Sequence, residues 1–321
     1  MNMELLNLHI KGITTSPWFI KKKEYPNYIY CEKFLWGRAI RGIILNYLLR
    51  NYCKKFPNVK CEKCFKSNEC PFYNLYGNNE DKDMPKFIVS SLFFEKIKIK
   101  KAPILSRDFI TNGISKFKTI EYIDQNSIFE FEIILKNSSI KFLDYIKEAI
   151  ENTLDFIGWG GMCSKGYGRG KIIEIKEYDF DKWINEIDER IEKFEERKEI
   201  ELEIFPLLIL EDNGKIYKKI ENGFKKKLIN SINERYWQFF KENKYLNVKE
   251  INGNVSYKIM NAYSKKEKRF LKFEGIAGSL KLLFEKHLNK EELRMIGIAK
   301  YGIGRYKNQG FGSLLLRGDN M

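Results

Sequence analysis

Four cysteines lie close together near the start of the chain, in the pattern Cys53-x7-Cys61-x2-Cys64-x5-Cys70. The central Cys-x2-Cys pair is the usual two-ligand knuckle of a tetrahedral zinc site, and the outer two thiolates complete a four-cysteine shell. A closed shell leaves no coordination position open, so the spacing predicts a structural zinc ion. Four reduced thiols or an iron–sulfur cluster are the alternatives. Cys31 and Cys163 stand apart from this group.

Two glycine-rich stretches share one spacing: Gly158-x-Gly160-x5-Gly166-Tyr167-Gly168 and Gly302-x-Gly304-x5-Gly310-Phe311-Gly312. Each follows a helical pattern and precedes a strand pattern. Nucleotide-binding loops have the opposite order, because they follow a strand and open a helix. Neither stretch contains Gly-Lys-Ser or Gly-Lys-Thr, which disfavours nucleoside triphosphate binding.

Basic or amide side chains accompany both stretches: Lys165, Arg169 and Lys171 in the first, and Arg305, Lys307 and Gln309 in the second. Backbone N–H groups together with cationic side chains suit phosphodiester oxygens. The aromatic residues Tyr167 and Phe311 either stack on bases or anchor the loop. The alternative is a tight helix-to-strand turn that needs glycine for packing, which leaves the basic residues unexplained.

The charge of the chain favours a polyanionic partner. There are 58 Lys and Arg against 43 Asp and Glu, a formal net charge of +15, although genome composition is another source of such an excess. No apolar run approaches the roughly 20 residues that span a bilayer, and the N-terminus lacks a signal-peptide pattern. We therefore expect a cytoplasmic protein without membrane contact, in a compartment where thiols stay reduced.

The elements that position these residues follow the order β-α-β-β-α-β, which occurs twice in the 321 residues. Helical spacing predicts a helix over 138–157, and Asn289 with Glu292 predicts a capped helix start. The sequence predicts an α+β protein of two tandem ferredoxin-like (RRM-like) domains, each with a glycine-rich loop before its last strand. The expected first domain covers 1–178 and carries a cysteine-rich insertion at about 53–76. A charged linker, at least partly helical, covers 179–198, and the second domain covers 199–321.

This arrangement resembles the RAMP superfamily of CRISPR-associated RNA-binding proteins. The stretch "LWGRAIRGIILNYLL" is similar to the arginine–glycine helix of that family, and a cysteine cluster after this helix recurs in one branch. The tail "FEGIAGSLKLLFEKHLNKEELRMIGIAKYGIGRYKNQGFG" is similar to the signature of the repeat-processing endoribonucleases. The resemblance implies a protein that binds CRISPR repeat RNA and processes the precursor crRNA.

The implied reaction needs no metal ion. The 2′-hydroxyl of the RNA attacks the adjacent phosphate, leaving a 2′,3′-cyclic phosphate and a 5′-hydroxyl. No carboxylate cluster suggests a two-metal nuclease. Two alternatives remain open: a non-catalytic RNA-binding subunit of a CRISPR effector complex, and a zinc-stabilised RNA-binding protein unrelated to CRISPR.

In this family a histidine near the first helix often serves in cleavage, but the chain has only His9, on the polar side of the first strand, and His287, before the last helix. We therefore expect a catalytic site at the first helix built from Tyr30, Arg38 and Lys54. Arginine stabilises the phosphorane, and tyrosine or lysine carries the proton. The residues expected to bind RNA are Arg41, Gly160, Lys165, Gly166, Tyr167, Arg169, Lys171, Gly304, Arg305, Lys307, Gln309, Gly310 and Phe311.

Overall fold

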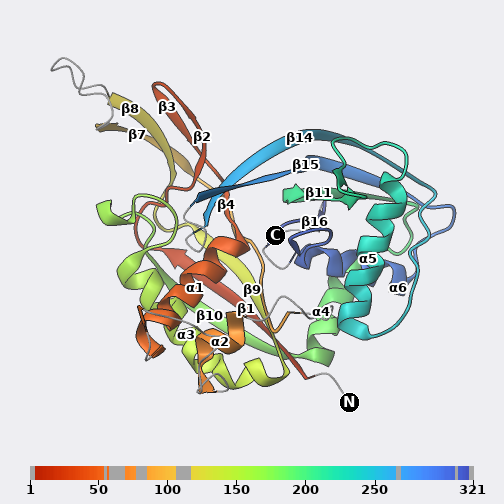
Figure 1. The fold of residues 1–321 in the computed structure, drawn as a ribbon, viewed down its shortest axis with the longest axis horizontal. Coiled ribbons are helices and arrows are strands. Elements are labelled where there is room, and N and C mark those ends of the chain that lie inside the picture. The colour runs from red at the N-terminus through yellow and green to blue at the C-terminus, as the bar shows by residue number, and fades with distance from the viewer. Residues whose placement is uncertain are drawn as a thin grey trace. The chain divides into compact units, whose positions relative to one another are not determined.

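The computed structural model describes residues 4–53, 56–57, 69–76, 85–105, 117–264, 269–307 and 310–317. The chain divides into two compact units, the first reaching Asp179 and the second beginning at Phe180. Each unit combines sheets and helices (Figure 1), so the expected α+β class is confirmed. Within the described ranges, no helix is both long enough and apolar enough to cross a bilayer.

The main sheet of the first unit has the strand order β10-β1-β9-β6-β4, and β5 also pairs with β9. Its strands are β1 (Leu5–Thr14), β4 (Phe34–Leu35), β5 (Phe87–Val89), β6 (Leu92–Phe94), β9 (Ile128–Lys136) and β10 (Gly170–Asp179). All of these pairs are antiparallel. Helix α1 (Gly37–Tyr52) follows the first strand, and α3 (Leu143–Asn152) separates β9 from β10. In β10-β1-β9-β6, the last strand of the unit lies beside the first, followed by the third and the second. This is the strand order of a ferredoxin-like sheet.

The core of this unit lies on one face of that sheet. Alternate residues of β1, Leu8 and Ile10, are fully buried with Ile44 of α1 and Ile146 of α3. Because side chains alternate across a strand, the intervening residues of β1 point to the other face. The expected helix over 138–157 is present as a short 3-10 turn η4 (Asn137–Phe142), α3 and a π-turn η5 (Thr153–Ile157).

A second sheet in the first unit was not anticipated from the sequence. It has the order β2-β3-β8-β7 and comprises β2 (Lys21–Tyr25), β3 (Tyr28–Cys31), β7 (Ile99–Leu105) and β8 (Phe117–Ile123). Figure 1 shows these strands as a group separate from β1, β9 and β10. The short helix α2 (Pro71–Tyr76) contacts α1.

The second unit repeats the strand order of the first. Its four-stranded sheet runs β14-β15-β11-β16, all antiparallel, with β11 (Glu199–Leu208), β14 (Glu250–Ser264), β15 (Arg269–Leu283) and β16 (Ser313–Leu316). Helix α5 (Phe224–Phe240) follows the small hairpin β12 (Glu211–Asp212) and β13 (Lys215–Ile216), and α6 (Lys290–Ile298) precedes the 3-10 turn η7 (Ala299–Tyr301). Figure 1 shows β14 and β15 as a long curved hairpin.

The predicted cap of α6 is present in full. The N–H of Glu292 donates to Oδ1 of Asn289 at 2.8 Å, and the N–H of Asn289 donates to the Glu292 carboxylate at 3.1 Å. This reciprocal pair satisfies two N–H groups that the first helical turn leaves unpaired.

Residues 179–198, expected to form a charged and partly helical linker, are mostly helical in the structure. Most of them form helix α4 (Phe180–Glu192), which belongs to the second unit and contacts α6. Trp183 of α4 is buried and donates its indole N–H to the hydroxyl of Tyr301 at 2.9 Å. Most of the charged residues in this segment lie on the solvent side of an amphipathic helix, with the buried Asp188 as an exception. The apolar side of the helix supplies core residues such as Ile187.

Candidate nucleic-acid interface

The two glycine-rich loops place positive-φ residues at equivalent positions. Residues with positive φ occur at matching positions: Gly158 (83°), Gly160 (96°), Met162 (59°), Gly166 (84°) and Gly168 (86°) in the first loop, and Gly302 (89°), Gly304 (74°), Tyr306 (60°), Gly310 (82°) and Gly312 (71°) in the second. The shared spacing of the sequence therefore sets the same series of left-handed turns in the described residues of both loops.

Each loop is hydrogen-bonded to the end of the first strand of its own unit or to the residues directly after that strand. Gly168 N–H donates to the Pro17 carbonyl at 2.8 Å, and Gly312 N–H donates to the Leu207 carbonyl at 2.9 Å. A second pair of bonds also matches: Gly161 N–H donates to Phe19, and Arg305 N–H donates to Ile209. These N–H groups are satisfied within the protein.

Backbone atoms of the same chain pack directly against two of the loop glycines. A Cβ at Gly168 would overlap the carbonyl oxygen of Trp159, and one at Gly312 would overlap that of Ile303. Both glycines also have positive φ, which other residues rarely adopt. The structure therefore favours the packing interpretation of these two glycines, whereas a Cβ at Gly166 would meet open space.

The aromatic residues at matching positions differ in environment. Phe311 is 1 % exposed and stacks on Phe273, with ring centroids 4.8 Å apart. Of the two roles left open for this ring, its burial therefore favours anchoring the second loop over stacking on bases or binding RNA. Tyr167 is half-buried and lies edge-on to Tyr122 at 6.2 Å.

The cations of the second loop are paired with acids. Lys307 donates to Glu234 of α5 at 2.6 Å, and only 11 % of its side chain is exposed. Burial lowers the pKa of Lys307. Arg305 forms an ion pair with Glu211. Gln309 lies outside the described residues.

The cations of the first loop are exposed. Lys165, which ends the 3-10 turn η6 (Cys163–Lys165), and Arg169 and Lys171 all lie on the surface. None of the three forms an ion pair with an acid elsewhere in the described part of the chain. The backbone of Arg169 is fixed on both sides, because its N–H donates to Ser16 Oγ at 2.9 Å and its carbonyl accepts from the Trp18 indole at 2.8 Å. A rigid backbone thus presents unpaired positive charge.

The sequence model of the RAMP superfamily matches residues 13–171, a range that ends with this loop. Residues 13–171 are a RAMP superfamily domain. No curated protein sequence matches the chain. Among solved structures, one that aligns is titled a cryo-EM structure of the Type III-B Cmr-beta bound to cognate target RNA, with 12 % identity and a TM-score of 0.40. That alignment covers 54 % of this chain and 61 % of the other, so the chain spans less than two thirds of its structural neighbour.

The residues expected to be catalytic occupy different elements of the RAMP domain. Tyr30 lies on β3, where its ring is 4.7 Å from that of Tyr28 and 42 % of the residue is exposed. Arg38 lies in the first turn of α1, and burial lowers the pKa of its guanidinium. Lys54 lies outside the described residues.

Arg41 is hydrogen-bonded within the RAMP domain. Its guanidinium donates to the carbonyls of Leu75 and Tyr76 at the end of α2, at 3.2 and 2.9 Å, and lies 5.8 Å from the ring of Phe87. These contacts join α2 to α1, and burial lowers the pKa of Arg41. Its side chain therefore braces two helices, in contrast to the expected contact with RNA.

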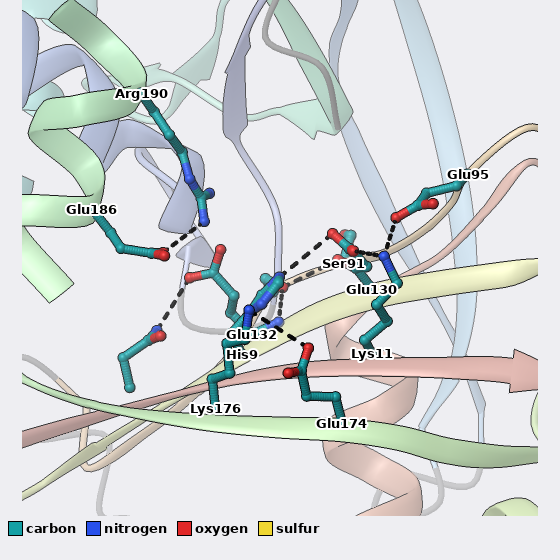
Figure 2. Close-up of polar contacts among 12 residues, drawn as sticks. His9, Lys11, Ser91, Glu95, Glu130, Glu132, Glu174, Lys176, Glu186 and Arg190 are labelled. Atoms are coloured by element: carbon teal, nitrogen blue, oxygen red, sulfur yellow. Dashed lines mark hydrogen bonds and ion pairs between the residues drawn. The ribbon is translucent and has the colours of Figure 1, made fainter.

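Sequence reasoning gave little weight to a charged network on the polar side of β1 (Figure 2). Lys11 donates to Glu95 at 2.7 Å and to Glu130 at 2.9 Å, and His9 Nε2 lies 3.5 Å from Glu130. The hydrogen bond with His9 is the largest of several that hold the pKa of Glu130 well below its usual range. The alternation of β1 placed His9 beside Lys11, but only strand pairing brings Glu130 to them.

The second histidine belongs to the second unit. His287 is exposed, and its Nδ1 lies 2.7 Å from the carbonyl oxygen of Glu196 in the second unit. His9 is thus the histidine with a carboxylate partner, an arrangement that suits proton transfer.

Proposed function

We propose that this chain is an RNA-binding RAMP protein of a CRISPR system, and that the first glycine-rich loop holds the ribose-phosphate backbone of a CRISPR repeat. The observation that carries the proposal is the exposed trio Lys165, Arg169 and Lys171, which lies on this loop and at the start of β10. Internal hydrogen bonds fix the backbone of the loop. The net charge of +15 supports a polyanionic ligand. The fixed backbone lets the cations contact phosphates without a large ordering cost.

The second candidate function, favoured by the His9–Glu130 pair, is metal-independent cleavage of the bound precursor crRNA. His9 takes the proton of the 2′-hydroxyl, O2′ bonds to phosphorus, and the 5′-oxygen leaves with a proton from an acid. The products carry a 2′,3′-cyclic phosphate and a 5′-hydroxyl. Arg38 is the candidate cation for the phosphorane, and Tyr30 and Lys54 are candidate proton carriers.

One assay separates processing from non-catalytic guide binding within an effector complex. Labelled repeat RNA is incubated with the protein in EDTA, binding is read by anisotropy, and product ends are mapped. Cleavage that His9→Gln abolishes without loss of affinity supports the endoribonuclease. Tight binding of intact RNA supports the non-catalytic subunit, and absence of binding contradicts both.

A structural zinc ion held by Cys53, Cys61, Cys64 and Cys70 is part of the proposal. Cys53 directly follows α1 and Cys70 directly precedes α2, and the two helices are in contact. Cys61 and Cys64 lie outside the described residues. Four thiolates suit zinc and leave no position for a substrate.

A further inference from the structure

The second sheet of the RAMP domain has one packed face and one open face. Ile29 of β3 and Ile120 of β8 are buried with Phe19 on the packed face. Alternation along the strands therefore directs the neighbouring residues to the opposite side. The register places Tyr25 across from Tyr28, Lys23 across from Tyr30, and Lys101 across from Glu121.

Three tyrosine rings cluster on the open face. The Tyr30 centroid lies 4.7 Å from that of Tyr28 and 5.7 Å from that of Tyr25. Tyr25 and Tyr30 are 43 % and 42 % exposed, although aromatic rings usually bury most of their area in a core or an interface. The rings are held against one another and remain accessible, so a flat ligand meets a surface that is already ordered.

Two lysines border the rings. Lys23 Nζ lies 4.6 Å from the Tyr25 centroid, and Lys101 Nζ lies 5.4 Å from the Tyr28 centroid. A hydrogen bond with Tyr28 raises the pKa of Lys101, so this lysine stays charged. The acid on this face, Glu121, is engaged by the Tyr28 hydroxyl at 2.8 Å and by the Cys31 N–H at 3.2 Å. The face therefore offers aromatic surface and positive charge together.

We infer that this tyrosine face, formed by Lys23, Tyr25, Tyr28, Tyr30 and Lys101, binds unpaired bases of single-stranded RNA. Bases stack on Tyr25 and Tyr30, and the lysines contact the flanking phosphates. Stacking requires bases free of a duplex, which makes the site selective for single-stranded segments. The inference rests on the proposed function for the identity of the ligand, but it names a second site, distinct from the first glycine-rich loop. In this inference Tyr30 stacks on a base, a role that differs from the proton transfer considered for it above.

The test compares single-stranded and duplex RNA of one sequence by fluorescence anisotropy. The double variant Tyr25→Ala/Tyr30→Ala is expected to weaken single-strand binding about tenfold or more, with duplex binding unchanged. Tyr25→Phe/Tyr30→Phe keeps the rings and should bind as wild type does. Tyr245→Ala, at a tyrosine that is 67 % exposed in the second unit, is the matched control and should have no effect.

A crosslinking experiment uses the unaltered protein and so does not depend on variant folding. Single-stranded RNA carrying 4-thiouridine should crosslink to the peptide that contains Tyr25 and Tyr30. Wild-type affinity of the double alanine variant, or crosslinks confined to other peptides, would overturn the inference. If wild type binds RNA through Lys165, Arg169 and Lys171 and the tyrosine variant is unaffected, only this inference fails. If wild type binds no RNA, the proposed function fails as well.

Discussion

Lys307 of the second glycine-rich loop donates to Glu234 of α5 at 2.6 Å, and this contact leaves little of its charge for a ligand. Arg305 is paired in the same way with Glu211. The two loops share their positive-φ positions, but acids neutralise Arg305 and Lys307 of the second loop, whereas the cations of the first form no ion pair among the described residues. The proposed function therefore assigns phosphate binding to the first loop.

This difference predicts unequal effects of charge removal on RNA binding. Neutralising Lys165, Arg169 and Lys171 with glutamine should weaken repeat RNA binding and reduce the slope of log K against log salt by about 2, since each lost phosphate contact on a single strand contributes about 0.7. The matched variant Arg305→Gln/Lys307→Gln should change the slope by less than about 0.7. Anisotropy titrations across salt concentrations measure both, and equal slopes for the two variants would contradict the assignment of the first loop.

The loop glycines predict a stability effect that depends on position. Gly168→Ala should lower the free energy of unfolding by about 3 kcal/mol, because a left-handed backbone costs about 1–2 kcal/mol and the overlap with Trp159 adds about 1–3. Gly312→Ala should behave alike. Gly166→Ala, where φ is also positive (84°) but the added Cβ meets open space, should cost only about 1–2 kcal/mol. Urea unfolding measures the free energy of each variant. If Gly166→Ala lost as much stability as Gly168→Ala and Gly312→Ala, close packing would not be the reason for the larger losses.

A buried ion pair joins α4 to α6. Arg294 donates to both carboxylate oxygens of Asp188, at 2.9 and 2.6 Å, and Lys290 lies 3.2 Å away. Burial opposes ionisation of Asp188, but the hydrogen bonds from Arg294 and Lys290 outweigh it and hold the pKa below its usual value. Because the ordinary aspartate pKa is about 3.9, the pair stabilises the fold above that pH and is lost as the pH falls through the lower folded value.

Asp188→Asn should therefore lower the free energy of unfolding at pH 7 by about 2–3 kcal/mol, somewhat below a fully buried pair because Arg294 is partly exposed. The gap between variant and wild type should narrow as the pH falls below about 4. Asp181→Asn, an exposed position on the same helix, should have little effect. Urea unfolding at pH 7 and at a pH below about 4 tests this prediction. A stability difference that widens in acid would show that the ion pair is not the cause of the difference.

The cysteine cluster predicts bound metal. Protein purified without chelator should carry about one zinc per chain, because a four-thiolate shell closes around a single ion. Cys61→Ser and Cys64→Ser should each lose it. Cys31→Ser should retain it, since Cys31 is buried in the core, where burial raises its pKa to about 11. Elemental analysis supplies the measurement, and iron in place of zinc would favour an iron–sulfur cluster.

Several features were predictable because they depend on residues close in sequence. The glycine spacing marked two equivalent loops, alternation placed His9 and Lys11 on one side of β1, and Asn289 with Glu292 marked the start of α6. Spacing along the chain determines strand faces, helix caps and positive-φ turns. These local relations depend on neighbouring residues and therefore do not require knowledge of the tertiary structure.

Tertiary structure decided which of these residues are free to bind. Lys307 meets Glu234 and His9 meets Glu130 only through packing and strand pairing between segments far apart in sequence. The tyrosine face likewise requires β3 to pair with β8, which joins β2 and β3 to β8 and β7. Strands as short as β2 and β3 have weak sequence patterns of their own. Charge and residue type are properties of the sequence, whereas the neutralisation of a cation or the exposure of a ring depends on its neighbours in space.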